Sequence, residues 1–477
     1  MMSSPPDHAR LREQLAAAGQ EHIYTFYHTL ATAERDRLDA QVASLDWSLI
    51  QELVETLVKR PRPCVRPGTL EPAPYFPHHP ADRETEEKYR LARRRGEELL
   101  RQGKVAAFVV AGGQGTRLGC PGPKGTLPVT PVRRKPLFQC FAEFIRAWES
   151  RCGCATPFYI MTSPANHAAT VAFWTQQRYF GLGDDQVMFF PQAMLPAVDF
   201  AGKVLLESPA SLALCPNGHG GSLLALHASG SLADMARRGI EQISYFQVDN
   251  PLVRCLDPLF IGLHDLAAAD MSSKMLPKIC GKEKVGTFCL ADGKLTVIEY
   301  SDLPEDLAEQ RRPDGTLRFS AGSIALHVLR RDFVERLSAG GFALPYHRAE
   351  KKVSCLDLPS GRLLHPAQPN AVKLETFIFD ALPLARRSII YETDRLDEFA
   401  PIKQLEGVDS LRSSQEITVA RNAAWLEAAG VKVPRQPDGK ADCVIEIAPS
   451  FALYPEDVRR RKHQIPPLSS GGSIYLA

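Results

Sequence analysis

The chain has 477 residues, enough for two or three domains, and its 44% hydrophobic content is ample for a packed core. Its 57 lysines and arginines nearly balance 55 aspartates and glutamates, and the formal net charge of +2 argues against a nucleic-acid or membrane-surface binder. Neither a signal peptide nor a membrane span is visible, and the 11 cysteines form no zinc or disulfide pattern, so we expect a cytoplasmic protein with reduced thiols.

The first 100 residues are predicted to be mostly helical. Periodic apolar residues predict two helices before residue 60, one of them ending at Gly19. Seven prolines between Pro61 and Pro80 exclude regular structure and predict a linker. A charged helix over residues 84–102 follows and ends at Gly103.

From residue 104 the pattern alternates strands, loops and helices, which is typical of a mostly parallel sheet with helices on both faces. Strands are predicted at 105–110, 156–162, 187–190 and 243–248, with a helix at 166–179. In such sheets ligands bind at the carboxyl ends of the strands, so the residue after each strand is a candidate for the site.

The most informative stretch is VVAGGQGTRLGCPGPK, which begins at the end of the first of these strands. Three glycines stand near its start, Gly112, Gly113 and Gly115. Glycine allows positive φ and leaves backbone N–H groups open to an anion, and Arg117 and Lys124 add positive charge. A dinucleotide fingerprint would need glycine at Leu118, and a P-loop would need Ser or Thr after the lysine. We predict an anion-binding loop, with a tight turn carrying two exposed cations as the alternative.

Two further stretches are candidates for ligand contact. Gln192 directly follows a predicted strand, where its amide can pair with another amide or with a nucleobase edge. The segment NGHGG, which contains Gly218 and His219, places glycines before an apolar helical run at 222–226. An ordinary glycine turn explains that second segment equally well.

The strand at 243–248 ends in Asp249, and Pro251 prevents its continuation. A carboxylate at this edge can hold a hard divalent cation that bridges phosphates. Asp249 is therefore the metal candidate, and an aspartate that caps the following turn is the alternative.

Residues 285–290 and 295–300 predict a β-hairpin with an Asp-Gly turn. The hairpin presents Glu299, which can hold sugar hydroxyls or simply lie exposed. Another short strand of small residues is predicted at 319–324.

The last third of the chain combines helices, a strand and loops. The predicted elements are the start of a helix at 369–375, a loop that projects Lys403, a helix at 413–429, a strand at 443–447 and a loose tail at 466–477. Ser413 and Glu416 have the spacing of a capping box.

Taken in order, these motifs resemble UDP-N-acetylhexosamine pyrophosphorylases of the eukaryotic type. The motifs are GGQGTRLG with PK, MLPA, NGHGG, VDN, VIEYSD, FSAGSI, PNAVKLETFIFD and DEFAPIK. The resemblance spans about residues 20–450 and implies an α/β fold of nucleotide-diphospho-sugar transferase type, GT-A-like, with a mostly parallel central sheet. It implies a helical N-terminal region (1–103), a catalytic domain (104–385) and a small α+β C-terminal domain with the loose tail (386–477).

In that family UTP and a sugar 1-phosphate give UDP-sugar and pyrophosphate, with Mg²⁺ as cofactor. By resemblance, the nucleotide contacts are Ala111, Gly112, Gly113, Gly115, Thr116, Gln192 and Gly218. The catalytic residues are Arg117, Lys124 and Lys403, and the metal ligand is Asp249. The sugar contacts are His219, Gly286, Glu299, Ser323 and Lys373. A sugar phosphate is already anionic, so its attack needs alignment and charge neutralisation more than a base. We expect a monomer or weak homo-oligomer that binds neither nucleic acid nor membrane.

Two departures from the family concern the sugar. His219 stands where the acetylhexosamine enzymes usually have Asn and where UDP-glucose pyrophosphorylases commonly have His, and Ser323 replaces a sugar-contacting Asn. Glu299 matches the family. These residues favour N-acetylglucosamine 1-phosphate slightly and leave a UTP-glucose-1-phosphate uridylyltransferase or a broad UDP-sugar pyrophosphorylase as alternatives.

A non-catalytic UDP-sugar binding protein is the alternative of another class. It would keep the glycine loops but lose charges that act only on the transition state. Those charges are present here, as Arg117, Lys124, Asp249 and Lys403. The sequence therefore favours an enzyme, and the failed dinucleotide fingerprint argues against a dehydrogenase.

Overall fold

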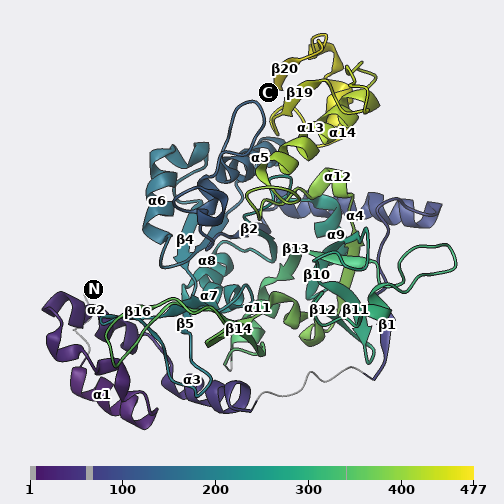
Figure 1. The fold of residues 1–477 in the computed structure, drawn as a ribbon. Helices are drawn as coiled ribbons and strands as arrows, with labels where there is room; N and C mark the ends of the chain where they lie inside the picture. Colours follow the sequence, from purple (N-terminus) through teal and green to yellow (C-terminus); the bar gives the residue numbers. More distant parts are fainter. Residues whose placement is uncertain (1–6, 61–67, 340) are drawn as a thin grey trace. The chain divides into compact units, whose positions relative to one another are not determined.

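The computed structural model describes residues 7–60, 68–339 and 341–477 (Figure 1). Residues 1–6 and 61–67, the start of the chain and the first part of the predicted linker, lie outside the described residues. The chain divides into two compact units made of separate stretches. Unit 1 comprises Met1–Pro67, Gln192–Ser222 and Leu344–Asp380, and unit 2 comprises Gly68–Pro191, Leu223–Ala343 and Ala381–Ala477. This grouping differs from the three consecutive regions expected from the sequence, which stay a prediction.

Unit 2 is built on a ten-stranded sheet with the order β1-β11-β13-β9-β2-β3-β4, to which β10, β12 and β18 attach. The strands are β1 (Leu70–Pro72), β2 (Val105–Val110), β3 (Phe158–Thr162), β4 (Val187–Pro191), β9 (Gln242–Gln247), β10 (Met271–Pro277), β11 (Thr287–Ala291), β12 (Lys294–Ile298), β13 (Ala321–Arg330) and β18 (Ser388–Glu392). Neighbours among β9, β2, β3 and β4 are parallel, whereas β13 pairs with β9 in the antiparallel sense. The predicted α/β fold is confirmed, and its parallel strands are those whose ends carry the glycine-rich loop and Asp249.

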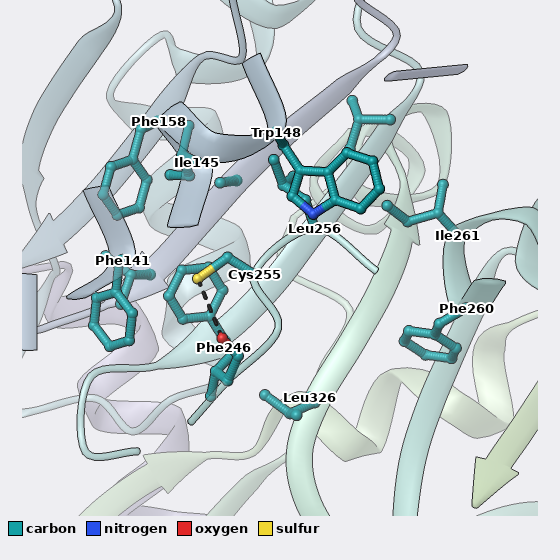
Figure 2. Packing of buried hydrophobic residues seen from close by; sticks show 14 of the residues in the cluster. Phe141, Ile145, Trp148, Phe158, Phe246, Cys255, Leu256, Phe260, Ile261 and Leu326 are labelled. Carbon is teal, nitrogen blue, oxygen red and sulfur yellow. Dashed lines mark hydrogen bonds between the residues drawn. The ribbon is translucent and has the colours of Figure 1, made fainter. Parts of the chain in front are cut away.

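Helices cover both faces of this sheet. The helices of unit 2 are α4 (Arg83–Arg101), α5 (Leu137–Cys152), α6 (His167–Gln176), α7 (Gly221–Ala228, whose first two residues belong to unit 1), α8 (Ser231–Arg237), α9 (Pro258–Leu266), α10 (Glu305–Ala308), α11 (Arg331–Ser338), α12 (Arg395–Glu398), α13 (Leu411–Ala428) and α14 (Pro455–Arg460). Of these, α13 and α14 pack in a separate hydrophobic cluster with residues 443–447. Successive residues of β3 point to opposite faces. Phe158 packs into the main hydrophobic cluster with Phe141 of α5 and Phe246 (Figure 2), whereas Tyr159 donates a hydrogen bond to Asp234 of α8 (2.7 Å).

Short helices occupy several connections. They are η1 (Glu21–Tyr24), η2 (Tyr27–Thr29), the π-helical η3 (Val54–Val58), η4 (Thr116–Leu118), η5 (Lys124–Thr126), η6 (Arg178–Gly181), η7 (Ile378–Leu384) and η8 (Lys462–Gln464). None of the helices within the described ranges is long and apolar enough to cross a membrane.

Helices α4 and α9 touch through their backbones, because each has a glycine at the contact. A Cβ at Gly262 of α9 would overlap the carbonyl oxygen of Ala92, and one at Gly96 of α4 would overlap that of Pro258. We expect Gly262→Ala to lower the free energy of unfolding by about 3 kcal/mol, because the helices must separate. This loss outweighs the helix preference of alanine over glycine, about 1 kcal/mol.

Chemical denaturation measures this change, and Leu91→Ala is the control. Leu91 lies on the same helix α4 but is 46% exposed, so its truncation should change stability by less than about 0.5 kcal/mol. Equal stabilities for the two variants would contradict the close helix contact.

Unit 1 contains three helices and eight short strands among its described residues. They are α1 (His8–Ala17), α2 (Thr32–Ala43), α3 (Trp47–Leu53), β5 (Met194–Pro196), β6 (Leu206–Ser208), β7 (Ser211–Leu212), β8 (Leu214–Pro216), β14 (Tyr346–Lys351), β15 (Cys355–Leu356), β16 (Leu363–Leu364) and β17 (Ala371–Thr376). The two helices predicted before residue 60 are confirmed as α1 and α3. Their buried side chains share one hydrophobic cluster with residues of β17.

The predicted helix start at 369–375 is wrong, because this segment forms β17 and pairs with β14 in the antiparallel sense. Val372 and Leu374 are buried, whereas the alternate residues Lys373 and Glu375 are half-buried. This period of two is that of a strand with one face in the core, and it is visible in the sequence AVKLET.

Three more local predictions need correction. The proline-rich linker contains a strand, β1, because an edge strand tolerates proline. Helix α13 is capped by Ser410, which exchanges hydrogen bonds with Ser413, rather than by Ser413 and Glu416. The tail is not loose throughout, since β20 (Gly472–Leu476) pairs in parallel with β19 (Cys443–Ile447), the strand predicted at 443–447.

Candidate active site

The glycine-rich loop between β2 and η5 is closed by its own backbone. Lys124 N donates to the Gly113 carbonyl (3.1 Å), and Gly115 N donates to the Gly122 carbonyl (2.8 Å). A Cβ at Gly115 would stand 2.8 Å from the carbonyl oxygen of Cys120, so this position requires glycine. The loop is therefore a defined turn and not a flexible connection.

Three consecutive amides at the start of the loop are open. Within the described residues, nothing accepts a hydrogen bond from the N–H groups of Gly112, Gly113 or Gln114. A Cβ at Gly113 would meet open space, so a ligand can approach the backbone there. Adjacent amides of this kind form a concave site for an anion, as the sequence predicts.

The predicted positive φ occurs at other glycines of the loop. Gly119 and Gly122 have φ of 70° and 114°, whereas Gly112, Gly113 and Gly115 do not adopt positive φ. The reason is that the chain reverses at the far end of the loop. The early glycines instead provide access to the backbone and room for Cys120.

Asn166, whose role the sequence analysis missed, holds the loop on the sheet. Its buried Nδ2 donates to the carbonyls of Ala111 (3.0 Å) and Gly113 (3.2 Å), and its Oδ1 accepts from Ser163 N (2.8 Å). The position, directly before helix α6, favours Asn as a cap, but the two carbonyls lie more than 50 residues away in the sequence. Only the fold reveals this contact.

Lys124 lies half-buried at the start of η5 and interacts electrostatically with Asp249, Lys403 and Arg117. Burial lowers the pKa of Lys124, the Asp249 carboxylate opposes this change, and Lys403 and Arg117 add to it. The structure thus brings together the predicted catalytic and metal-binding residues. Uncompensated positive charge at this place favours an anionic ligand.

Main-chain hydrogen bonds bring Lys403 to Asp249. Ile402 N donates to the Asp249 carbonyl (2.9 Å), so the chain before Lys403 runs against the end of β9. Lys403 N donates to the Asp409 carbonyl (2.6 Å), which closes the following loop. The Lys403 side chain is exposed and therefore accessible to a substrate.

A second group of predicted residues, Gly286, Glu299 and Ser323, also comes together in unit 2. A Cβ at Gly286 would stand 3.4 Å from Glu299 Oε1, and Ser323 N donates to the Gly286 carbonyl (2.7 Å). Glu299 follows β12 of the predicted hairpin, which is confirmed with Asp292 and Gly293 at its turn. The three residues of unit 2 that the sequence predicts as sugar contacts therefore lie close to one another.

The second glycine segment, NGHGG, lies in unit 1 and is fixed to the end of β17. Thr376 N donates to the Asn217 carbonyl, and Gly220 N donates to the Thr376 carbonyl (both 2.8 Å). Gly218 has φ of 85°, and a Cβ there would overlap the Thr376 backbone. Gly218 is therefore required for a backbone turn, whatever it binds.

His219 is held as a neutral hydrogen-bond donor. Ile378 N donates to its Nδ1 (3.1 Å), and the rings of Phe377 and Phe379 lie 5.3 and 5.8 Å from it. Burial lowers the pKa of His219 to about 4. Because Nδ1 accepts a hydrogen bond from a backbone amide, which can only donate, the proton of the neutral ring must be on Nε2.

A prediction about pH follows from this neutral state. We expect the dependence of kcat/KM on pH between about pH 5 and 9 to be the same for wild type and His219→Asn. The imidazole, with its pKa lowered from 6.5 to about 4, stays neutral over this range. An ionisation near pH 6.5 that is present in the wild type and lost in His219→Asn would contradict the assigned tautomer.

The same shift affects stability. Below about pH 6.5 the unfolded chain takes up a proton at His219 that the folded chain does not bind, so folding becomes less favourable as the pH falls toward 4. His219→Asn should therefore lose less stability than the wild type between these pH values, as measured by urea denaturation.

Gln192 and Lys373 complete the predicted residues of unit 1. The Gln192 side chain is largely buried, and none of the described residues hydrogen-bonds to it, so its amide is available to a ligand. Lys373 Nζ forms an ion pair with Glu375 (3.2 Å) on the same face of β17. A sugar contact by Lys373 would compete with this pair.

Asp249, the predicted metal ligand, has another carboxylate near it, that of Asp409. No group of three or more His, Cys, Asp or Glu side chains suited to a metal occurs among the described residues. Asp249 and Asp409, however, are close enough to interact electrostatically. Mg²⁺ in phosphate-transfer sites is held by one or two carboxylates together with substrate phosphates and water, so these residues fit such an ion.

A parallel sheet whose strand ends carry open amides, clustered cations and a carboxylate defines a nucleotidyltransferase of the sugar-nucleotide type. Residues 77–474 match the family model described as UTP–glucose-1-phosphate uridylyltransferase, and the chain belongs to this family. The family resemblance deduced from the motifs is confirmed, as is the assignment as an enzyme.

Individual relatives give the same result. The chain is 35% identical to human UDP-N-acetylhexosamine pyrophosphorylase-like protein 1, with 92% of each chain covered. It is 35% identical to UDP-N-acetylglucosamine pyrophosphorylase of Saccharomyces cerevisiae, covering 78% of this chain and 79% of the relative. A crystal structure of the Trypanosoma brucei uridine diphosphate N-acetylglucosamine pyrophosphorylase, 25% identical, superposes with a TM-score of 0.82 and covers 100% of this chain and 99% of that one.

Proposed function

We propose that this chain transfers the uridylyl group of UTP to N-acetylglucosamine 1-phosphate, giving UDP-N-acetylglucosamine and pyrophosphate. The observation that carries this proposal is the cluster of Arg117, Lys124, Lys403 and Asp249, three of whose members are cations. The names of the relatives support the choice of sugar.

The reaction moves no proton. An oxygen of the sugar phosphate attacks the α-phosphorus of UTP, a new P–O bond forms, and the bond to the β-phosphate oxygen breaks. Pyrophosphate leaves with the bonding electron pair. The protein's contribution is to align the two anions and to neutralise the charge that concentrates around the α-phosphorus.

Each cation has its own part in this step. The open amides of the glycine-rich loop and Arg117 bind the triphosphate, and Lys124 neutralises charge at the reacting phosphates. Lys403, exposed beside Asp249, approaches the sugar phosphate. Asp249, with Asp409 near it, would hold Mg²⁺, which when bound adds positive charge at the phosphate oxygens.

Base and sugar are recognised by different residues. Gln192 and the Gly218 backbone pair with the uracil edge, since a buried amide without a protein partner favours a ligand that offers both a donor and an acceptor. Within unit 2, the neighbours Gly286, Glu299 and Ser323 contact the sugar. Within unit 1, His219 offers an Nε2 donor to the ligand.

Pyrophosphate release from UTP and Mg²⁺ tests the proposal, with N-acetylglucosamine 1-phosphate, N-acetylgalactosamine 1-phosphate and glucose 1-phosphate compared in parallel. We expect the highest kcat/KM with N-acetylglucosamine 1-phosphate. If none of the three sugar phosphates led to pyrophosphate release, the enzymatic function would be refuted and a non-catalytic UDP-sugar binder would be favoured. A clear preference for glucose 1-phosphate, the alternative that His219 and Ser323 leave open, would replace the proposed substrate.

We also propose that the enzyme acts in the cytoplasm as a monomer or weak homo-oligomer. The free thiols of the described cysteines suit a reducing compartment. Sedimentation at several concentrations tests the oligomeric state.

A further inference from the structure

Asn250, the residue after Asp249, joins two segments that are about 150 residues apart. Its buried Nδ2 donates to the Glu398 carbonyl (2.6 Å), and its Oδ1 accepts from Ala400 N (3.1 Å). A backbone peptide group would pair with a neighbouring strand in the same way. The amide of Asn250 thus fixes the chain three to five residues before Lys403.

A second contact holds the same segment from another side. Ser414, buried near the start of α13, donates through Oγ to the Ala400 carbonyl (2.8 Å). Ala400 is therefore bound at both its N–H and its carbonyl. Together with the Ile402–Asp249 hydrogen bond, these contacts leave the backbone before Lys403 little freedom.

The end of α12 is anchored to the central sheet by buried charges. Glu398 is fully buried and accepts from Lys274 Nζ of β10 at 2.6 and 2.8 Å, and Lys274 is paired with Asp257 as well (2.6 Å). Glu398 also accepts from Thr393 Oγ1 and from Arg254 N (3.3 Å). A buried charge whose partner moves away is left uncompensated, so such a cluster resists displacement.

The Lys403 side chain itself is exposed. Its Nζ lies 5.9 Å from the centroid of the Phe399 ring, in the same segment that Asn250 holds. Its position relative to Asp249 therefore depends on the buried backbone contacts of this segment. Asn250 is the residue that connects these contacts directly to the turn carrying Asp249.

We propose that Asn250 is a positioning residue for the reaction: its side-chain amide fixes the distance between Lys403 and Asp249, so that both act on the same phosphates. The inference rests on the proposed uridylyl transfer. Displacement of a catalytic group by about 1 Å can lower a rate by about 10²-fold, which is the size of effect expected here.

Kinetics of Asn250→Ala provide the test. We expect kcat for pyrophosphate release to fall about 10²-fold while the KM for UTP changes less than about threefold, because the glycine-rich loop is untouched. Asn250→Asp keeps the acceptor for Ala400 N but loses the donor to the Glu398 carbonyl. Its kcat should therefore lie between those of the wild type and Asn250→Ala. In a Lys403→Ala background, Asn250→Ala should lower kcat less than about twofold further.

Asn422→Ala is the matched control. Asn422 is a fully buried Asn in unit 2, and its Nδ2 donates to the Ile445 carbonyl (2.9 Å), so this hydrogen bond involves neither the turn carrying Asp249 nor the segment before Lys403. It should lose stability and keep the wild-type kcat. If Asn250→Ala does not fold, Ser414→Ala carries the test, with a fall in kcat of about three- to tenfold at unchanged KM for UTP.

Three results would overturn the inference: an unchanged kcat in Asn250→Ala, a raised KM for UTP at unchanged kcat, or an undiminished effect in the Lys403→Ala background. These outcomes differ from failure of the proposed function, in which the wild type itself releases no pyrophosphate from any sugar phosphate and the inference falls with it.

Discussion

Lys403→Ala is expected to lower kcat for pyrophosphate release by about 10³-fold and to change the KM for UTP less than about threefold. A charged group that meets the developing charge only in the transition state contributes about 3 to 4 kcal/mol, which corresponds to this factor. Lys403 lies on the exposed side of the cluster beside Asp249, whereas the amides expected to bind UTP belong to the glycine-rich loop. Steady-state kinetics with N-acetylglucosamine 1-phosphate measure both parameters.

Lys282→Ala is the control for this loss of charge. Lys282 is also an exposed lysine of unit 2, paired with Glu305 (3.1 Å) and assigned no part in the reaction, so kcat should be unchanged. An equal loss of kcat and of UTP affinity in Lys403→Ala would show that Lys403 binds the nucleotide and does not act selectively on the transition state.

Lys124→Met should lower kcat/KM for UTP by about 10³-fold without making the protein less stable. The methionine keeps the apolar length of the side chain but removes a charge that burial and the neighbours Lys403 and Arg117 disfavour, as the lowered pKa of Lys124 indicates. Removing that charge removes an electrostatic cost of folding. It also removes a cation that neutralises the triphosphate, so kcat/KM for UTP falls. Kinetics and urea denaturation of the same preparation measure the two effects.

Lys135→Met provides the opposite case. Lys135, a buried lysine of unit 2, donates hydrogen bonds to Glu143 (2.6 Å) and to the Tyr475 hydroxyl (2.8 Å). Its loss leaves Glu143 unpaired and should cost about 3 kcal/mol of stability at unchanged kcat/KM. If Lys124→Met were destabilised as strongly as Lys135→Met, Lys124 would be a structural residue.

Secondary structure is predictable where the local sequence pattern and the tertiary environment favour the same element. The apolar runs that predict β2, β3 and β9 are confirmed, because strands in the middle of a covered sheet are buried on both faces. Strand β17 was mistaken for a helix, although its alternation of buried and half-buried residues fits a strand. Strand β20 is not predicted from its sequence, because Gly and Ser have low strand preference. Its extended conformation depends on pairing with β19.

For the site, the rule that ligands meet the carboxyl ends of parallel strands was enough to select the glycine-rich loop and Asp249. The loop amides are open as predicted, but positive φ occurs at Gly119 and Gly122 and not at the three glycines at the start of the loop. The tautomer of His219 depends on Ile378 N, a group about 160 residues away that no local pattern indicates.

The α/β class, the family and the anion-binding character of the loop can be predicted from the amino-acid sequence, because apolar period, glycine clustering and paired cations are properties of neighbouring residues. The folded chain is needed to see that Lys403 lies beside Asp249 and that Asn166 and Asn250 hold the glycine-rich loop and the segment before Lys403 in place. The physical reason is that these are hydrogen bonds and charge interactions between groups separated by about 50 to 150 residues. Their formation depends on how the chain packs. The sequence around an Asn does not indicate which distant carbonyl its side-chain amide will bind.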